Sequence, residues 1–135
     1  SRGDVWIATT GNVNELLRWQ RSSGEWRDFT AQAGFGKFRM GTAFIEDGAG
    51  NLWIGTGGDG GDGALIRCRD ENFKVFAQAD GAPPGWTRDL FLDSRGRLWL
   101  ANTEWGLLRL NDTNTETLNF VRYSTPEGLS SRGIY

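Results

Sequence analysis

The 135-residue chain has the length of one ordinary domain, and its 20 Gly, 7 Trp and 8 Phe are typical of many short strands joined by tight turns. Its 15 basic and 17 acidic residues give a formal net charge of −2 with no block of one sign, which argues against binding of nucleic acid or a membrane surface by charge. The absence of His excludes Ser-His triads, imidazole bases and most zinc sites, and no apolar run approaches the length of about 18 residues that would cross a membrane.

One sequence pattern recurs three times and sets the organisation of the chain. The matching segments are residues 3–9, 50–56 and 96–102, which read GDVWIAT, GNLWIGT and GRLWLAN. Their tryptophans, Trp6, Trp53 and Trp99, stand 47 and 46 residues apart. A period in the forties is typical of the blades of a β-propeller.

Within each repeat, short apolar runs predict four strands. In the second repeat these runs are 42–47, 51–56, 64–69 and 73–77. They are rich in aromatic and branched side chains and are bounded by Gly, Asp, Asn and Ser, which favours strands over helices. The third and fourth strands of the other repeats match at 16–19, 107–110, 26–29 and 120–123.

Tight turns join the predicted strands. Segments 47–50 (DGAG) and 93–96 (DSRG) begin with an Asp, whose carboxylate can bond the turn backbone, and end with a Gly, which supplies a positive φ. Asp47 and Asp93 are therefore interpreted as structural residues. The turns between the third and fourth strands are 22–25 and 70–72.

The predicted fold is all-β, with β-propeller blades formed by three four-stranded antiparallel repeats. The repeats are approximately 1–39, 40–86 and 87–132, and a further repeat starts at 133–135. A single blade cannot bury both faces of its sheet, so blades stack and the repeated tryptophans are expected in the core. Because propellers usually have about 4 to 8 blades, the chain is expected to be a partial propeller or part of an assembled ring.

The signature of the second repeat resembles that of a known family. Residues 47–56 read Asp-x-x-Gly-x-Leu-Trp-Ile-Gly-Thr and residues 106–109 read Gly-Leu-x-Arg, and both resemble the two-component regulator propeller repeat. Segment 126–135 is similar to the sequence that leads into the first strand of that repeat. The departures from the family pattern are Ala8 and Ala101 in place of Gly, Asn102 in place of Thr, and Glu15 and Ala64 at the position where Gly106 matches.

This resemblance implies a sensor β-propeller of bacterial signalling proteins, located in the periplasm or outside the cell. Several relatives sense oligosaccharides, so the implied partner is a small-molecule or oligosaccharide ligand, and no cofactor is expected. Further propeller blades or a second copy of the chain are the other expected partners, without nucleic acid or membrane contact by this segment. The chain lacks the phospho-acceptor of a histidine kinase because it has no His.

Propeller function usually lies on one face, where the loops after the second and fourth strands converge near the axis. In this chain those loops carry the candidate ligand-binding residues Arg39, Trp86, Arg88, Trp105 and Arg132. Flat Trp faces beside Arg donors suit sugar rings with hydroxyl or carboxylate groups. The alternative is that Trp86 and Trp105 pack against neighbouring blades.

Two other features have both a structural and a functional interpretation. Segment 56–63 (TGGDGGDG) is predicted to be a long loop, with calcium binding as the alternative. Cys68, the single cysteine, is expected to be a small buried residue and not a reactive thiol.

The leading functional hypothesis is a non-catalytic binding module whose ligand shifts packing or dimerisation. The second hypothesis is a protein-interaction or self-assembling structural scaffold. The third, a carbohydrate-active enzyme, would need paired carboxylates in a pocket, and no acidic pair stands out from the repeat.

Overall fold

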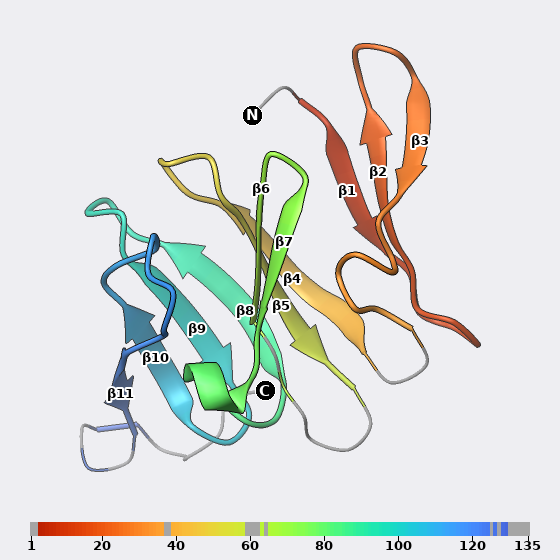
Figure 1. Cartoon of the computed structure of the whole chain (residues 1–135). Coiled ribbons are helices and arrows are strands. Elements are labelled where there is room, and N and C mark those ends of the chain that lie inside the picture. Colours follow the sequence, from red (N-terminus) through yellow and green to blue (C-terminus); the bar gives the residue numbers. More distant parts are fainter. Residues whose placement is uncertain are drawn as a thin grey trace.

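The computed structural model describes residues 3–36, 39–58, 63, 65–124, 126, 128 and 129. These residues form three antiparallel sheets that fan out side by side (Figure 1). The strands are β1 (Val5–Ala8), β2 (Leu16–Gln20), β3 (Glu25–Asp28), β4 (Met40–Glu46), β5 (Leu52–Gly57), β6 (Leu65–Arg69), β7 (Asn72–Phe76), β8 (Thr87–Leu92), β9 (Leu98–Asn102), β10 (Gly106–Leu110) and β11 (Phe120–Tyr123). A short 3-10 turn, η1 (Gln78–Asp80), follows β7.

Strands that follow one another in the chain are neighbours in each sheet. The first sheet has the order β1-β2-β3, the second β4-β5-β6-β7 and the third β8-β9-β10-β11. This antiparallel meander is the architecture of a propeller blade. The prediction of an all-β fold built from propeller-like blades is confirmed.

The innermost strands of the second and third sheets each contain an irregularity that the sequence did not predict. β4 begins at Met40, before the predicted start of the run 42–47, and its register with β5 shifts between Gly41 and Ala43. Thr42 is therefore an extra residue in the ladder, which is a β-bulge. β8 repeats the bulge, with Arg88 as the extra residue.

The turn between β4 and β5 is organised by the carboxylate of Asp47. Oδ1 accepts hydrogen bonds from the backbone N–H groups of Ala49 and Asn51, both at 2.9 Å. Oδ2 accepts one from Nδ2 of Asn51 at 2.8 Å and one from Nε1 of Trp53 at 3.0 Å. One buried side chain thus fixes both the turn and the tryptophan that follows it.

The turn between β8 and β9 is built in the same way around Asp93. Its carboxylate accepts hydrogen bonds from the backbone N–H groups of Arg95 and Arg97 and, at 2.8 Å, from Nε1 of Trp99. Gly96 closes the turn with a φ of 73°, which favours glycine. The structural interpretation of Asp47 and Asp93 is therefore confirmed.

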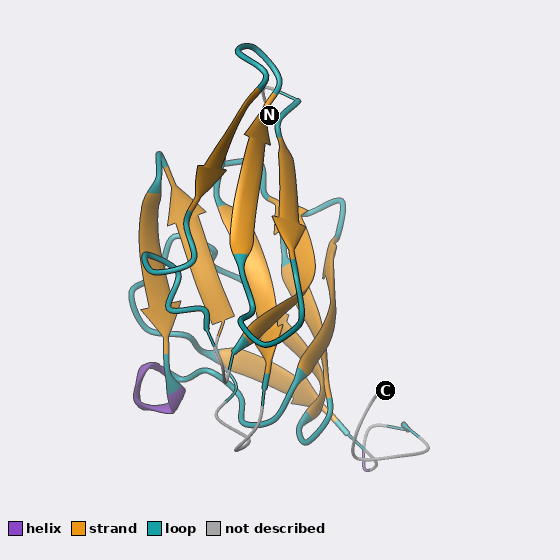
Figure 2. Ribbon diagram, turned by 90° about the vertical axis from the view of Figure 1, so that its right-hand side faces the viewer, coloured by secondary structure: helices purple, strands orange, loops and turns teal. Residues whose placement is uncertain are grey.

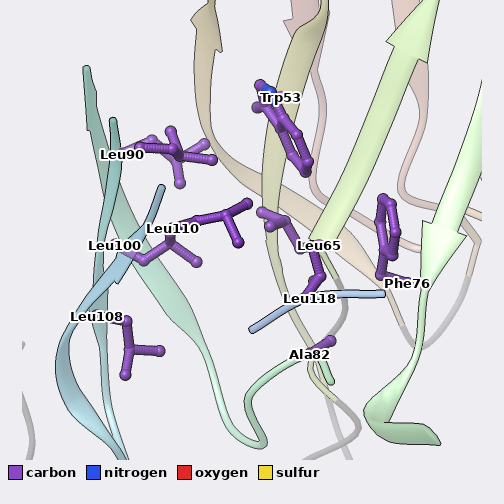
Figure 3. Packing of buried hydrophobic residues seen from close by; sticks show 10 residues of the cluster. Trp53, Leu65, Phe76, Ala82, Leu90, Leu100, Leu108, Leu110 and Leu118 are labelled. Carbon is purple, nitrogen blue, oxygen red and sulfur yellow. The ribbon is translucent and has the colours of Figure 1, made fainter. Parts of the chain in front are cut away.

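Two apolar clusters join the sheets, one between each pair of neighbours. Between the second and third sheets, Trp53 and Leu65 face Leu100 and Leu108 (Figure 3). The cluster between the first and second sheets contains Leu16, Phe29, Ala33, Phe35, Ile54 and Ile66. Successive strand residues point to opposite faces, so the second sheet is buried on both sides.

The three repeated tryptophans do not share one environment. Trp53 is fully buried, as predicted, and Trp6 packs across the boundary between sheets against Phe73, with ring centroids 6.1 Å apart. Trp99 is only half-buried and stacks on Tyr123, with ring centroids 5.5 Å apart. The expected core position is wrong for Trp99, because no further sheet covers that face within the described part of the chain.

The connections between strands gather at the two ends of the sheets. Figure 1 shows the β2–β3, β4–β5 and β6–β7 turns at the upper end, and the path from η1 to the start of β8 at the lower end. Figure 2, seen from the side of the first sheet, shows the sheets lying one behind another. No helix within the described residues is long and apolar enough to cross a membrane.

Candidate functional site

Trp86 and Arg88 come together at the lower end of the third sheet. The guanidinium carbon of Arg88 lies 4.5 Å from the centroid of the Trp86 ring, within cation–π range. Sequence reasoning assigned Arg88 to a loop, but it lies in β8, at the bulge. A bulge redirects the side chain of its extra residue, and Arg88 is exposed.

Trp86 is also fixed by the neighbouring blade. Its Nε1 donates a hydrogen bond to the carbonyl oxygen of Gly58 at 3.1 Å. Its ring covers Gly57 at the end of β5 so closely that a Cβ atom there would lie 2.5 Å from a ring carbon. The packing alternative therefore describes Trp86 correctly, and Arg88 meets a ring held in place by the second blade.

Asn102 connects the segment before β8 to the β9–β10 turn. It is fully buried, and its Nδ2 donates hydrogen bonds to the carbonyl oxygens of Pro84 at 3.0 Å and Trp86 at 3.2 Å. Its Oδ1 accepts hydrogen bonds from the backbone N–H groups of Glu104 at 2.9 Å and Trp105 at 2.8 Å. The side-chain amide of Asn102 thus holds both the segment before β8 and the β9–β10 turn in place.

Trp105 lies in the β9–β10 turn and belongs to a second pair. Its half-buried ring packs against the apolar cluster between the second and third sheets. The guanidinium carbon of Arg122, from β11, lies 4.4 Å from the centroid of that ring. Arg122 was not among the predicted candidates. No ring contact joins Trp105 to Trp86 among the described residues.

The remaining candidate residues do not join these pairs in the described structure. Arg39 precedes β4, and its Nη1 donates a long hydrogen bond of 3.5 Å to the carbonyl oxygen of Gly34. Arg132 lies outside the described residues. Asp59 and Asp62, the acidic residues of the glycine-rich loop, also lie outside them.

Two hollows lie between neighbouring sheets, at the end opposite the Trp86–Arg88 pair. The hollow between the first and second sheets measures about 500 Å³ and is lined by Asp4, Trp6, Arg18, Gln20, Glu46, Gly50, Leu52, Cys68, Asp70 and Glu71. The hollow between the second and third sheets measures about 460 Å³ and is lined by Asn51, Arg67, Arg69, Asn72, Phe73, Lys74, Asn114 and Glu116. The second hollow offers amides, an aromatic ring and cations, so it is a rival location for a polar ligand.

The buried titratable groups are suited to structural roles. Burial opposes ionisation of Asp47, but hydrogen bonds from Asn51 and Trp53 outweigh it and hold the pKa of Asp47 below its usual value. The Trp99 indole lowers the pKa of Asp93 in the same way. Burial raises the pKa of the Cys68 thiol to about 11, which agrees with the predicted inert cysteine. Within the described ranges, no group of three or more His, Cys, Asp or Glu side chains is placed to bind a metal.

The segment that contains the Asp47 turn and the Trp53 strand also matches a known family. Residues 40–58 match the two component regulator propeller family. The match covers β4, the turn and β5, and it confirms the resemblance predicted from residues 47–56. The comparison with curated proteins finds no relative.

Beyond the matched two component regulator propeller segment, almost the whole chain is similar in structure to a solved protein. That protein is the extracellular domain of the hybrid two component system BT4673 from B. thetaiotaomicron, with a TM-score of 0.60 and 19% sequence identity. The similarity covers 96% of this chain, and the chain spans 18% of the length of that domain. At this level of identity, the similarity shows a shared fold.

The role of Asn102 was missed because the two component regulator propeller signature has Thr at that position. Asn102 was interpreted only as a departure from the signature. A polar residue at the end of an apolar strand is, however, a signal for a buried hydrogen-bonding group. The bulge at Arg88 gave no comparable signal. Both of its neighbours, Thr87 and Asp89, are polar, so the sequence had no apolar alternation for the bulge to interrupt.

Proposed function

We propose that the chain is a non-catalytic ligand-sensing module of a bacterial two-component-type sensor, and that the ligand is an oligosaccharide. The match of residues 40–58 to the two component regulator propeller family carries this proposal. The similarity in fold to an extracellular sensor-system domain supports it. The proposed module acts in the periplasm or outside the cell, and the extracellular location of the similar domain supports this part of the proposal.

A binding role agrees with the chemistry of the described residues better than a catalytic one. The sequence has no His, and the carboxylates of Asp47 and Asp93 are occupied by hydrogen bonds that keep them ionised. An ionised, fully bonded carboxylate is a poor general acid. The Trp86–Arg88 pair offers a ligand a guanidinium donor and a flat ring.

The proposed binding position is the Trp86–Arg88 pair. The bulge exposes the guanidinium of Arg88, and the second blade fixes the Trp86 ring beneath it. A fixed aromatic ring can stack on a sugar ring, and the fork of donors on Arg88 can bind its hydroxyl or carboxylate groups. Asn102 holds the backbone of this position, so the site is preorganised.

Calorimetric titration with neutral and uronic-acid oligosaccharides tests the proposal. Arg88→Ala is expected to weaken binding about tenfold, the effect of losing a charge-assisted hydrogen bond. Arg95→Ala, in an exposed turn at the other end of the same blade, is the matched control and is expected to bind normally. Loss of binding in Arg69→Ala instead of Arg88→Ala would move the ligand to the hollow between the second and third sheets. Failure of every oligosaccharide to bind would contradict the proposed ligand class.

The second candidate function is a protein-interaction or self-assembling scaffold. The observation that favours it is the exposure of large apolar side chains on the outer sheets, among them Trp26 at 58% and Phe91 at 63%. Exposed apolar faces of this kind mark association surfaces.

A further inference from the structure

Basic side chains outnumber acidic ones around the hollow between the second and third sheets. Three cations and one carboxylate line it: Arg67, Arg69, Lys74 and Glu116. The hollow between the first and second sheets has the opposite balance, with one cation and four carboxylates: Arg18, Asp4, Glu46, Asp70 and Glu71. The two hollows lie at the same place in successive pairs of blades, so the fold does not fix their charge.

Two of the three cations belong to a contact that the blades repeat. Arg67 and Lys74 are cross-strand neighbours in β6 and β7. Both bond the carboxylate of Glu116, which lies between β10 and β11 of the third blade, at 2.9 Å. A similar triad joins the first and second blades: Arg18, Arg27 and Glu71. Attachment of the next blade therefore accounts for Arg67 and Lys74.

Arg69 is not explained by this repeated contact. It follows Arg67 by two positions, on the same face of β6, and its side chain is exposed at the hollow. Gln20 takes its place in the first blade, and its own cross-strand neighbour, Asn72, is uncharged. Within the described part of the chain, no carboxylate pairs with Arg69. A cation of this kind in a concave surface attracts an anion from solution.

Two neighbours of Arg69 in the lining have hydrogen-bond donors left over. Lys74 Nζ lies 2.9 Å from Oε2 of Glu116, and the other N–H groups of the ammonium remain for other acceptors. Asn114 Oδ1 accepts a hydrogen bond of 3.4 Å from Nδ2 of Asn51, and no acceptor for its own Nδ2 lies among the described residues. The lining thus has more donors than acceptors, which suits an anionic occupant.

Glu116 shows how this hollow acts on a carboxylate. Hydrogen bonds from Lys74 and Arg67 hold the pKa of Glu116 below its usual value, although the side chain is 72% exposed. The cations therefore favour the ionised form even in contact with solvent. An anionic group that lies between Lys74 and Arg69 meets the same kind of donors.

We propose that the hollow between the second and third sheets binds the anionic group of a small ligand, a carboxylate or a sulfate, between Arg69 and Lys74. The guanidinium of Arg69 presents a fork of donors that can bind two oxygens of such a group. The amide of Asn114 supplies a further donor. The hollow measures about 460 Å³, within the range of about 300–1,000 Å³ that is usual for small-molecule sites.

This inference goes beyond the proposed function, because it concerns a second site. The hollow adjoins the β6–β7 turn at the upper end of the sheets, whereas the Trp86–Arg88 pair lies at the lower end (Figure 1). A neutral oligosaccharide has no anionic group, so its titration reports on Trp86 and Arg88 alone. Either proposal can therefore fail while the other stands.

NMR titration of the isotopically labelled chain with glucuronate, sulfate and glucose tests the proposal, with sodium chloride holding the ionic strength constant. The backbone amide resonances of Arg69, Asn72 and Asn114 are expected to shift to saturation with glucuronate or sulfate and to stay in place with glucose. A response to one anion only identifies the group that the hollow selects. Arg69→Ala is expected to raise the dissociation constant at least about tenfold.

Glu116→Gln supplies a second test with the opposite direction. The variant removes the carboxylate that competes for Lys74, so the dissociation constant of the anion is expected to fall at least about threefold. Arg95→Ala, which removes an exposed arginine from the β8–β9 turn, is the control and is expected to bind as the unmodified chain does. Shifts that fail to saturate with both anions would overturn the proposal. Equal losses in Arg95→Ala and Arg69→Ala would also overturn it, since net charge alone would then explain the binding.

Discussion

Nε1 of Trp53 donates a hydrogen bond to Oδ2 of Asp47, six positions earlier in the chain, across a distance of 3.0 Å. The same carboxylate bonds the backbone of the turn, so the core tryptophan and the turn fix one another. This relationship explains the spacing of the signature Asp-x-x-Gly-x-Leu-Trp. Asp93 and Trp99 repeat it in the third blade.

Removal of the Asp47 carboxylate is expected to destabilise the fold. Asp47→Ala removes the carboxylate that accepts from the backbone N–H of Asn51 and from Nε1 of Trp53, at a cost of about 2–3 kcal/mol in the free energy of unfolding. Urea denaturation measures this cost. Asp112→Ala, which removes an exposed carboxylate that accepts a hydrogen bond from the backbone N–H of Asn114, is the control and is expected to cost less than about 1 kcal/mol. Equal losses in the two variants would refute the role of Asp47.

Acid is expected to weaken the fold through the same carboxylates. The folded chain holds the pKa values of Asp47 and Asp28 below the ordinary 3.8, so the unfolded chain takes up protons first as the pH falls. Their stabilisation is complete above the unfolded pKa and is lost as the pH drops through the folded pKa. The urea midpoint is expected to fall between pH 5 and pH 3, and to fall less in Asp47→Asn. A midpoint that is constant over this interval would contradict the prediction.

The parts of the fold that depend on one blade were predictable from sequence. Asp47 and its glycine lie in one turn, and the apolar runs form adjacent strands, so a period and local turn chemistry are sufficient to place them. Trp53 is buried as expected because the third sheet packs against it. Trp99 is not, because its burial depends on a neighbouring blade that the repeat pattern cannot supply.

The parts that depend on two blades were not predictable. Arg67 served only as a marker of the repeat, since its acceptors near Thr115 lie on another blade at a long sequence separation. The contact between the Trp86 ring and Gly57 was not predictable for the same reason, because it joins two different sheets. The bulge that exposes Arg88 is a shift in strand register. Because the residues on either side of Arg88 are polar, the sequence has no apolar alternation whose interruption would predict the bulge.

Loss of Arg67 is expected to loosen the contact between the second and third blades. Arg67→Ala removes hydrogen bonds to Thr115 and Glu116 and the stack on Trp53, so the expected loss is about 2–3 kcal/mol by urea denaturation. Arg67→Lys keeps the charge but not the planar fork of donors, and it is expected to restore less than half of the loss. Arg69→Ala, an exposed arginine two residues away, is the control. Full rescue by Lys would show that charge alone matters there.

A methyl group on Gly57 is expected to displace Trp86. The Cβ of Gly57→Ala would lie 2.5 Å from the indole, so the ring must move, at an expected cost of about 1–3 kcal/mol in unfolding free energy. The indole Nε1–H resonance, assigned by comparison with Trp86→Phe, is expected to shift as its bond to Gly58 breaks. Gly48→Ala is the matched control, because nothing lies within 4 Å of its Cβ position. If Gly57→Ala moved neither the resonance nor the stability, Trp86 would not be held by the second blade. The same variant separates the two parts of the binding site: a ligand that needs the fixed ring loses affinity in Gly57→Ala, whereas one that needs only the Arg88 charge does not.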